Sequence, residues 1–151
     1  MGAADAEEEP PGEGPAHWSF GTTADVGIAA RAADLPGLLE ELAQALVELI
    51  TDRGTLEPVE PRSFSLTAEN DEELVVAFLE EILYWQDAFG WLPRTVHVEP
   101  LPPGRREVRG TAQGEALDPR RHALRLGVKA ATLHLLEVSP DRRRARVILD
   151  I

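Results

Sequence analysis

The sequence predicts an α+β fold in which two helices pack on a mixed or antiparallel sheet. Two segments with helical spacing of apolar residues and several short segments with strand-like alternation support this prediction. Their order along the chain is strand–helix, then strand–helix–strand–strand, then strand–strand. This order indicates two nested strand-helix-strand-strand units, one inserted into the other. The sequence has no internal repeat, so we expect the repetition in the architecture alone.

The N-terminal residues differ in composition from the rest of the chain. Residues 1–16 consist mainly of Ala, Glu, Gly and Pro, and are predicted to be a disordered acidic tail. Residues 17–151 are long enough to bury a core and are predicted to form a single domain. This domain opens near Trp18. Residues 24–30 alternate weakly between small and apolar side chains, which indicates its first strand.

Two helices are predicted from capping residues and apolar spacing. Asp34 is a favourable N-cap, and the apolar residues after it recur three and four positions apart as far as Ile50. Gly54, just past the end of this series, is expected to be the C-terminal stop of the helix. Asn70, followed by three acids, caps a second helix that is expected to close at Gly90. The apolar face of the first helix comprises Leu35, Leu38, Leu39, Leu42, Leu46, Leu49 and Ile50.

The remaining strands are predicted from alternation and from turn residues. Residues 62–67 alternate with period two. Residues 95–99 and 107–112 are expected to pair as a hairpin around a Pro-Pro-Gly turn. A long strand over residues 125–138 and a final strand over residues 144–151 are expected to flank a Ser-Pro-Asp-Arg turn.

The charge of the chain is negative and unevenly spread. The net charge is -12, and residues 1–92 contain 20 acids and 3 bases, whereas residues 93–151 contain 7 acids and 12 bases. Nucleic-acid affinity comes mainly from phosphate neutralisation, so direct tight binding of RNA or DNA is not expected. Arg142–Arg144 and Arg146 are predicted to be a solvated turn. A bound cation or a basic protein partner fits the overall sign.

Several classes of protein are disfavoured by what the sequence lacks. It has no cysteine, which excludes disulfides, thiolate metal sites and cysteine catalysis. No apolar run approaches the roughly 20 residues of a membrane span. An acidic start without an apolar stretch does not resemble a signal peptide, so a cytoplasmic location is expected. Phosphate-binding glycine loops, nucleophile elbows and paired-histidine metal motifs are also missing, and an enzyme is therefore not expected.

The end of the chain is the most unusual local feature. Asp150 and Ile151 follow the apolar run Val147–Leu149 directly, so a side-chain carboxylate and a terminal carboxylate lie side by side. Two such charges repel unless a cation or a basic partner compensates them. Asp25, among small residues, is either a turn former or a ligand. If the first and last strands are neighbours, Asp25 adds a further oxygen donor that suits a divalent cation.

Other candidate residues each have a functional and a plain structural interpretation. Lys129 either pairs with one of the two aspartates or extends to solvent. His122 follows two arginines in a polar loop, where it either binds phosphate or an acidic partner, or is simply exposed. Thr132 and His134 are expected to form a polar pair on the exposed face of their strand.

Taken together, these motifs resemble the archease family. The resemblance covers about residues 17–151 and lies in the order and spacing of short motifs, each of them weak by itself. They are Thr23-Ala24-Asp25-Val26-Gly27, Leu49-Ile50-Thr51-Asp52, Gly114-Glu115, Asp118, His122, Val128-Lys129-Ala130, Thr132, His134 and Val147-Ile148-Leu149-Asp150-Ile151.

The resemblance implies a nested strand-helix-strand-strand fold and a non-catalytic accessory protein. Archeases activate the RtcB-type RNA ligase of tRNA splicing and RNA repair, promoting its guanylylation and its turnover. By the same resemblance, Asp25, Asp150 and the carboxylate of Ile151 hold a divalent metal ion, which is calcium, magnesium or manganese. The matching positions for partner binding or function are Lys129, His122 and His134.

The chain departs from the family pattern at two positions. Thr22 stands where the family usually has histidine, and Gly127 stands where it usually has an acid, so the site has fewer donors than is usual. Three other functions remain open. They are a metal-dependent phosphohydrolase that uses the same acids, an interaction module without metal, and a chaperone-like modulator of a tRNA methyltransferase.

Overall fold

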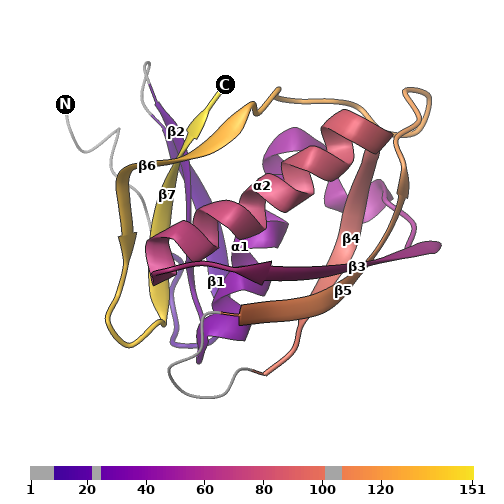
Figure 1. Ribbon diagram of the computed structural model, residues 1–151. Helices are drawn as coiled ribbons and strands as arrows, with labels where there is room; N and C mark the ends of the chain where they lie inside the picture. The colour runs from indigo at the N-terminus through magenta and orange to yellow at the C-terminus, as the bar shows by residue number, and fades with distance from the viewer. Residues whose placement is uncertain (1–8, 22–24, 101–106) are drawn as a thin grey trace.

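The computed structural model describes residues 9–21, 25–100 and 107–151, and its α+β architecture confirms the predicted fold class (Figure 1). Two helices and seven strands follow one another in these described parts, joined by a short 3-10 helix, η2. The elements are β1 (Ala16–Gly21), β2 (Val26–Arg31), α1 (Leu35–Ile50), η2 (Arg53–Thr55), β3 (Glu60–Thr67), α2 (Asp71–Phe89), β4 (Trp91–Val98), β5 (Glu107–Ala116), β6 (Ala130–Val138) and β7 (Arg144–Asp150).

The strands form two antiparallel sheets, of order β1-β2-β7-β6 and β3-β5-β4. In each unit the last strand lies between the first and the second, so β2-α1-β6-β7 and β3-α2-β4-β5 have the same topology. The second unit is inserted between α1 and β6, as the nested order predicts. The sheet expected from sequence is divided into two because each unit pairs its own three strands. β1 adds an edge strand to the larger sheet.

The two helices lie between the two sheets (Figure 1). α1 contacts β1 and β2 on one side and β4 on the other, and α2 contacts β6 as well as β3 and β4. The predicted apolar face of α1 is buried or partly buried in this shared core. Neither helix in the described parts combines the length and hydropathy that a bilayer-spanning helix needs. The core therefore joins both units into one domain.

The predicted helix caps are present, with one correction. The side chains of Asp34 and Asn70 accept hydrogen bonds from backbone N–H groups three residues on, at 2.9 and 2.8 Å. α2 closes at Gly90, which has a φ of 58° and so uses the left-handed region that favours glycine. Gly54, however, does not end α1. The helix ends at the extended residue Thr51, and Gly54 lies in η2.

β6 is shorter than predicted, because the residues before it cap α1. The amide of Arg125 donates to the carbonyl of Ile50 at 2.7 Å, and the hydroxyl of Thr51 donates to the carbonyl of Ala123 at 2.8 Å. The end of α1 thereby gains partners that its own helix does not supply. β6 is also interrupted by a bulge, since its pairing with β7 shifts register between Thr132 and Glu137.

Two predictions fall partly outside the described residues. The Pro-Pro-Gly turn lies in the segment 101–106, which is not described, although β4 and β5 pair as expected. The disorder predicted for residues 1–8 is likewise outside the described parts. Residues 9–14 are described, and their carbonyl groups and the Glu9 carboxylate contact Arg31 on β2.

Candidate functional site

One corner of the four-stranded sheet gathers three of the residues singled out from sequence. β2 begins, β7 ends and β6 begins at this corner, beside the C terminus (Figure 1). Val26 pairs with Leu149 at the end of the antiparallel β2–β7 ladder, so Asp25, which precedes Val26, and Asp150, which follows Leu149, both lie just beyond this pair. On the other side, the amide of Lys129 donates to the carbonyl of Asp150 at 2.7 Å. We call Asp25, Asp150 and the carboxylate of Ile151 the acidic corner.

The β1–β2 pairing next to the acidic corner depends on a glycine. Phe20 on β1 pairs with Gly27 on β2, and the phenyl ring lies across this glycine. A Cβ atom at position 27 would approach the ring to 2.3 Å, far inside van der Waals contact. The guanidinium of Arg146 lies over the same ring, 4.7 Å from its centroid. Gly27 therefore lets Phe20 cover β2 two residues after Asp25.

The acidic corner is open to solvent. Asp25 and Asp150 are exposed, and Ile151 retains 45% of its surface, whereas the preceding residues Val147 and Leu149 are buried. Buried residues thus hold the strand ends, while the carboxylates remain accessible to a partner. Within the described parts of the chain, no three His, Cys, Asp or Glu side chains lie close enough together to hold a metal ion.

The donor chemistry of the acidic corner fits a hard divalent cation in part. Two aspartates and a terminal carboxylate offer oxygen donors alone, as calcium, magnesium and manganese prefer. Six or more ligands are usual for calcium, and magnesium keeps several waters. The protein would therefore supply part of a coordination shell, and water or a partner would have to complete it.

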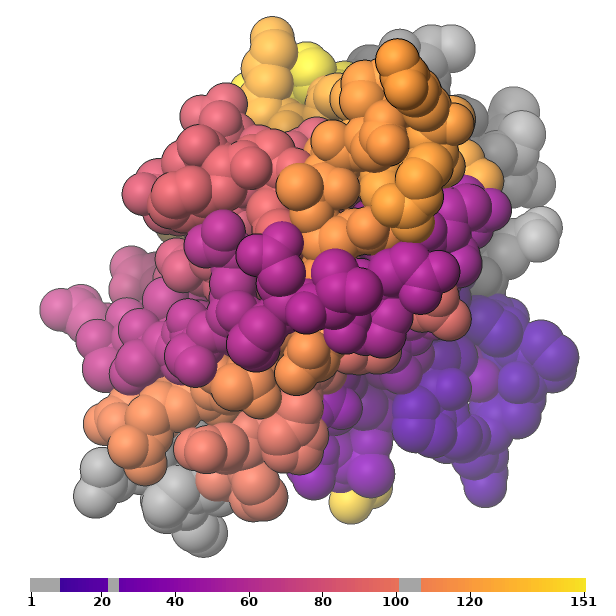
Figure 2. Space-filling view, turned by 90° about the vertical axis from the view of Figure 1, so that its right-hand side faces the viewer, coloured from indigo at the N-terminus to yellow at the C-terminus, as the bar shows by residue number. Residues whose placement is uncertain are grey.

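Lys129 connects the acidic corner to a groove along α2. The groove has a volume of about 550 Å³, and we call it the α2 groove. It is lined by Glu80, Leu83, Tyr84, Gln86, Asp87, Gly127, Val128 and Lys129. Figure 2 shows the residues of α2, in pink, at the surface close to the orange residues that follow β5. Two acids, Glu80 and Asp87, and one base, Lys129, line the α2 groove, so its charge is negative on balance.

The aromatic residues near the α2 groove divide into core and surface. Trp85 and Trp91 are buried in the core, with ring centroids 5.3 Å apart. Tyr84 and Phe89, which the sequence analysis did not single out, are about half exposed and contact one another edge to face at 5.7 Å. Tyr84 stands between the buried residues Leu83 and Trp85, and its place off the apolar face of α2 is the signal that could have identified it.

His122 is buried, and the expectation of an exposed loop histidine is wrong. Its Nδ1 accepts from the amide of Asp118 at 2.9 Å, so its Nε2 carries the proton and donates to Glu115 at 3.0 Å. Both ring nitrogens are thus engaged inside the chain. Asp118 forms a turn, since its carboxylate accepts from the amide of Arg120 at 2.9 Å. A partner-binding role for His122 stays a prediction, and the contacts show that it fixes this loop.

Glu115 is the acceptor at the centre of this loop. It is buried, and its carboxylate accepts from both terminal nitrogens of Arg121 at 2.8 and 2.9 Å and from the amide of Glu57 at 2.6 Å. The hydrogen bonds from Arg121, followed by those from Glu57 and His122, lower the pKa of Glu115 to about 2. Glu115 and His122 therefore tie the segment that leads to Lys129 onto the residues after α1.

His134 lies in the β6 bulge instead of pairing with Thr132. The Thr132 hydroxyl donates to the carbonyl of Ile148 at 3.0 Å. After Thr132 the pairing of β6 with β7 shifts register, so side chains no longer alternate regularly between the two faces of the sheet. Leu135 has a φ of 55°, which is rare for a bulky residue. Leu133, His134 and Leu135 are exposed. The bulge places His134 beside two exposed leucines.

The family of the chain follows from comparison with known proteins. The model of the Archease protein family (MTH1598/TM1083) matches residues 18–151. The chain belongs to the archease family. The archease of Methanothermobacter thermautotrophicus is 34% identical over 136 residues, which cover 87% of this chain and 96% of that protein. The archease of Methanopyrus kandleri is 35% identical over 132 residues, covering 85% and 94%.

Solved structures agree with this membership. The solution structure of Methanobacterium thermoautotrophicum protein 1598 has a TM-score of 0.70 and 30% identity, and the match covers 89% of this chain and 98% of that one. The crystal structure of an archease and possible chaperone from Thermotoga maritima has a TM-score of 0.55 and 19% identity, covering 97% and 99%. The second likeness shows a shared archease fold.

Proposed function

We propose that this archease is a non-catalytic accessory protein that activates an RtcB-type RNA ligase in tRNA splicing or RNA repair. Its acidic corner would act on the ligase and promote guanylylation and repeated turnover. The observation that supports this proposal best is the strand register, which brings Asp25 and Asp150 to one exposed sheet corner next to Lys129. The proposal includes a cytoplasmic location, with which a cysteine-free sequence agrees.

Each residue of the acidic corner would have a distinct task. Asp25 and Asp150 would concentrate negative charge at the end of rigid strands, and the Lys129 amide would hold the backbone of Asp150 in place. The carboxylate of Ile151 would add a further oxygen donor. A divalent ion bound there would supply positive charge of the kind that neutralises phosphate oxygens in phosphoryl transfer.

The α2 groove suits docking of the ligase beside the acidic corner. Its lining includes Glu80 and Asp87 together with the exposed ring of Tyr84. Such a surface favours a basic protein segment and repels RNA, because phosphates meet like charges there. The ligase itself would therefore be the partner, with its RNA kept on the ligase.

The proposal is tested by measuring ligase guanylylation and multiple-turnover ligation with and without the protein. Asp150→Ala, and separately the addition of one residue after Ile151, should abolish the stimulation while the thermal unfolding temperature is retained. Glu60→Ala, which changes an exposed acid on the other sheet, is the matched control and should stimulate like the wild type. Full stimulation by both corner variants would disprove the proposal.

Two further assays separate this function from alternatives that use the same acids. A phosphohydrolase would turn over phosphate esters when purified with metal, whereas an activator would show no turnover. Calorimetric titration with magnesium, calcium and manganese distinguishes a metal-binding corner from a metal-free interaction module. Binding heat that is lost in Asp150→Ala supports the acidic corner as the site, and no heat with any of the three ions supports the module.

A chaperone-like role, as a modulator of a tRNA methyltransferase, is the second candidate. The β6 bulge favours it, since Leu133 and Leu135 are each more than half exposed and flank a histidine. Exposed apolar side chains of this kind are where a client protein would bind. Leu133→Ser with Leu135→Ser should then weaken protection of the methyltransferase against aggregation and leave ligase stimulation unchanged.

A further inference from the structure

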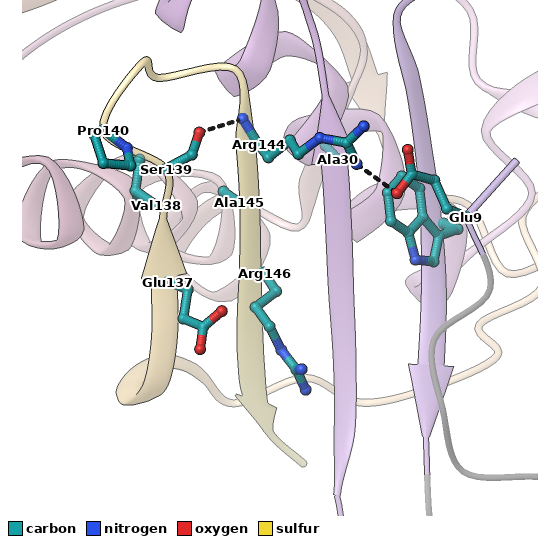
Figure 3. A pocket seen from close by; sticks show the side chains of 10 residues that line it. Glu9, Ala30, Glu137, Val138, Ser139, Pro140, Arg144, Ala145 and Arg146 are labelled. Carbon is teal, nitrogen blue, oxygen red and sulfur yellow. Dashed lines mark hydrogen bonds and ion pairs between the residues drawn. The ribbon is translucent and has the colours of Figure 1, made fainter. Parts of the chain in front are cut away.

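A second groove lies on the outer face of the four-stranded sheet, away from the helices. Its volume is about 450 Å³, and we call it the outer-face groove (Figure 3). It is lined by Glu9, Trp18, Ala30, Glu137, Val138, Ser139, Pro140, Arg144, Ala145 and Arg146. It adjoins the Arg31–Arg144 pair, at the opposite end of the β2–β7 ladder from the Val26–Leu149 pair. The groove is thus separate from the acidic corner.

Arg31, at the edge of this groove, holds the backbone of the N-terminal segment. Arg31 is 5% exposed, and its guanidinium donates to the carbonyls of Pro10, Pro11 and Gly14 at 2.7, 3.0 and 3.0 Å. It also donates to the Glu9 carboxylate at 2.9 Å. Three of these four contacts are to backbone groups, so Arg31 recognises a peptide by its main chain and by one carboxylate.

Arg144 supplies the second contact to the same carboxylate. Its side chain reaches across β2 and forms an ion pair with Glu9, as Figure 3 shows. The hydrogen bond from Arg144, supported by Arg31, lowers the pKa of the Glu9 carboxyl, and the same contact raises the pKa of Arg144. The Glu9 carboxylate therefore bridges two arginines, one buried and one exposed.

We propose that Arg31, Arg144 and the adjoining outer-face groove form a binding site for extended acidic peptides, and that residues 9–14 occupy the arginine end of this site in cis, with Glu9 reaching the groove. The chain shows the ligand chemistry itself, because its own Glu-Pro-Pro segment places a carboxylate between two arginines and carbonyls on the buried one. Charge complementarity favours the same class, since Arg31, Arg144 and Arg146 outnumber Glu137, the lining acid that does not come from the cis segment, on a protein with a net charge of -12. An acidic segment of a partner protein would compete with the cis segment.

Single-stranded nucleic acid is the less suitable occupant of this face. Base stacking on a sheet needs aromatic rings with a free face. The Phe20 ring lies against Gly27 on one side and has the Arg146 guanidinium over it, which leaves the partly exposed Trp18 as the lining residue that could stack on a base. The proposed ligand is therefore a peptide, and the test includes an oligonucleotide as the competing outcome.

The test uses the full-length chain and a synthetic peptide with the sequence of residues 5–15. A variant that combines Glu9→Gln, Pro10→Gly and Pro11→Gly removes the cis carboxylate and makes the backbone of the segment more flexible. We call it the loosened variant. Titration followed by amide and indole NMR signals should show saturable shifts at Trp18, Glu137 and Arg144. This variant should bind the peptide at least about tenfold more tightly than the wild type, because the Glu9 carboxylate of the chain no longer competes with the peptide for the two arginines.

Three controls identify what is recognised. Glu13→Gln changes an exposed acid of the same segment and should bind the peptide like the wild type. Arg144→Gln, added to the loosened variant, should weaken binding about tenfold or more while the NMR spectrum stays folded. A peptide with glutamine at the position of Glu9 should bind the loosened variant as weakly as the unchanged peptide binds the Arg144→Gln variant. All variants should stimulate the ligase like the wild type, because the acidic corner is unchanged.

The proposal is overturned by any of three results. The first is the absence of saturable NMR shifts when the peptide is added to the loosened variant. The second is equal affinity of this variant for the glutamine peptide and the unchanged peptide. The third is tighter binding of a single-stranded oligonucleotide of matched charge than of the peptide. The first result means that the groove has no peptide site. The second means that the carboxylate is not recognised, and the third means that the face binds nucleic acid.

Discussion

Replacing Gly27 by alanine tests how β1 is held against β2 beside the acidic corner. The new Cβ would lie 2.3, 2.7 and 2.9 Å from three atoms of the Phe20 ring, so the ring must move. Moving it gives up its packing on β2 and its contact with the Arg146 guanidinium. Overpacking of this kind costs about 1–3 kcal/mol, and the lost cation–π contact accounts for about 0.5–1 kcal/mol of it. We expect Gly27→Ala to destabilise the protein by about 2 kcal/mol.

The assay is denaturant unfolding monitored by tryptophan fluorescence. Gly127→Ala is the matched control, because a Cβ at position 127 meets nothing within 4 Å, and it should change the free energy of unfolding by less than about 1 kcal/mol. Phe20→Leu should make room at position 27, so the double variant should be less destabilised than the sum of the single variants by about 1 kcal/mol. Equal stability of Gly27→Ala and Gly127→Ala would refute the reasoning.

Two other predictions concern the loop before Lys129 and the β6 bulge. The pKa of Glu115 lies at about 2, below its ordinary 4.5, so its stabilising contribution is complete above about pH 4.5 and is lost as the pH falls toward 2. Glu115→Gln should lower the denaturation midpoint at pH 7 and flatten its decline below pH 4.5; an unchanged pH profile would contradict this. Leu135→Gly should be neutral or stabilising by up to about 1 kcal/mol, because glycine adopts a φ of 55° without strain. A clear loss of thermal stability in that variant would show that the Leu135 side chain packs well enough to outweigh the strain.

The helices could be predicted because their signals are local. Caps at Asp34 and Asn70 and the left-handed stop at Gly90 are read within a few residues, and apolar spacing fixes the buried faces. Strand pairing is non-local, and the split into two sheets could not be derived from alternation alone. A metal site at Asp25 and Asp150 requires the strand predicted over residues 24–30 to lie beside the last strand, and the β2–β7 ladder fulfils this condition.

The errors arise where tertiary contacts override local patterns. Residues around Arg125 look like a strand, yet they bond to the end of α1. His122 looks exposed because its neighbours in sequence are polar, but the loop folds it onto Glu115, seven residues earlier. The contacts of Glu9 with Arg31 and Arg144 join residues more than 20 positions apart, so composition gave no sign of them. In each case the deciding contact is made by the folded backbone and is not visible in the residues next in sequence.

Multiple-turnover ligation by an RtcB-type ligase, measured with Asp25→Asn, Asp150→Asn and the double variant, tests the acidic corner most directly. The two aspartates are each adjacent to one member of the Val26–Leu149 pair and are proposed to act as one unit. Each single variant should therefore lose as much stimulation as the double variant, which is the non-additivity expected of coupled residues. Full stimulation by either single variant, or losses that simply add, would contradict a shared site at this end of the sheet.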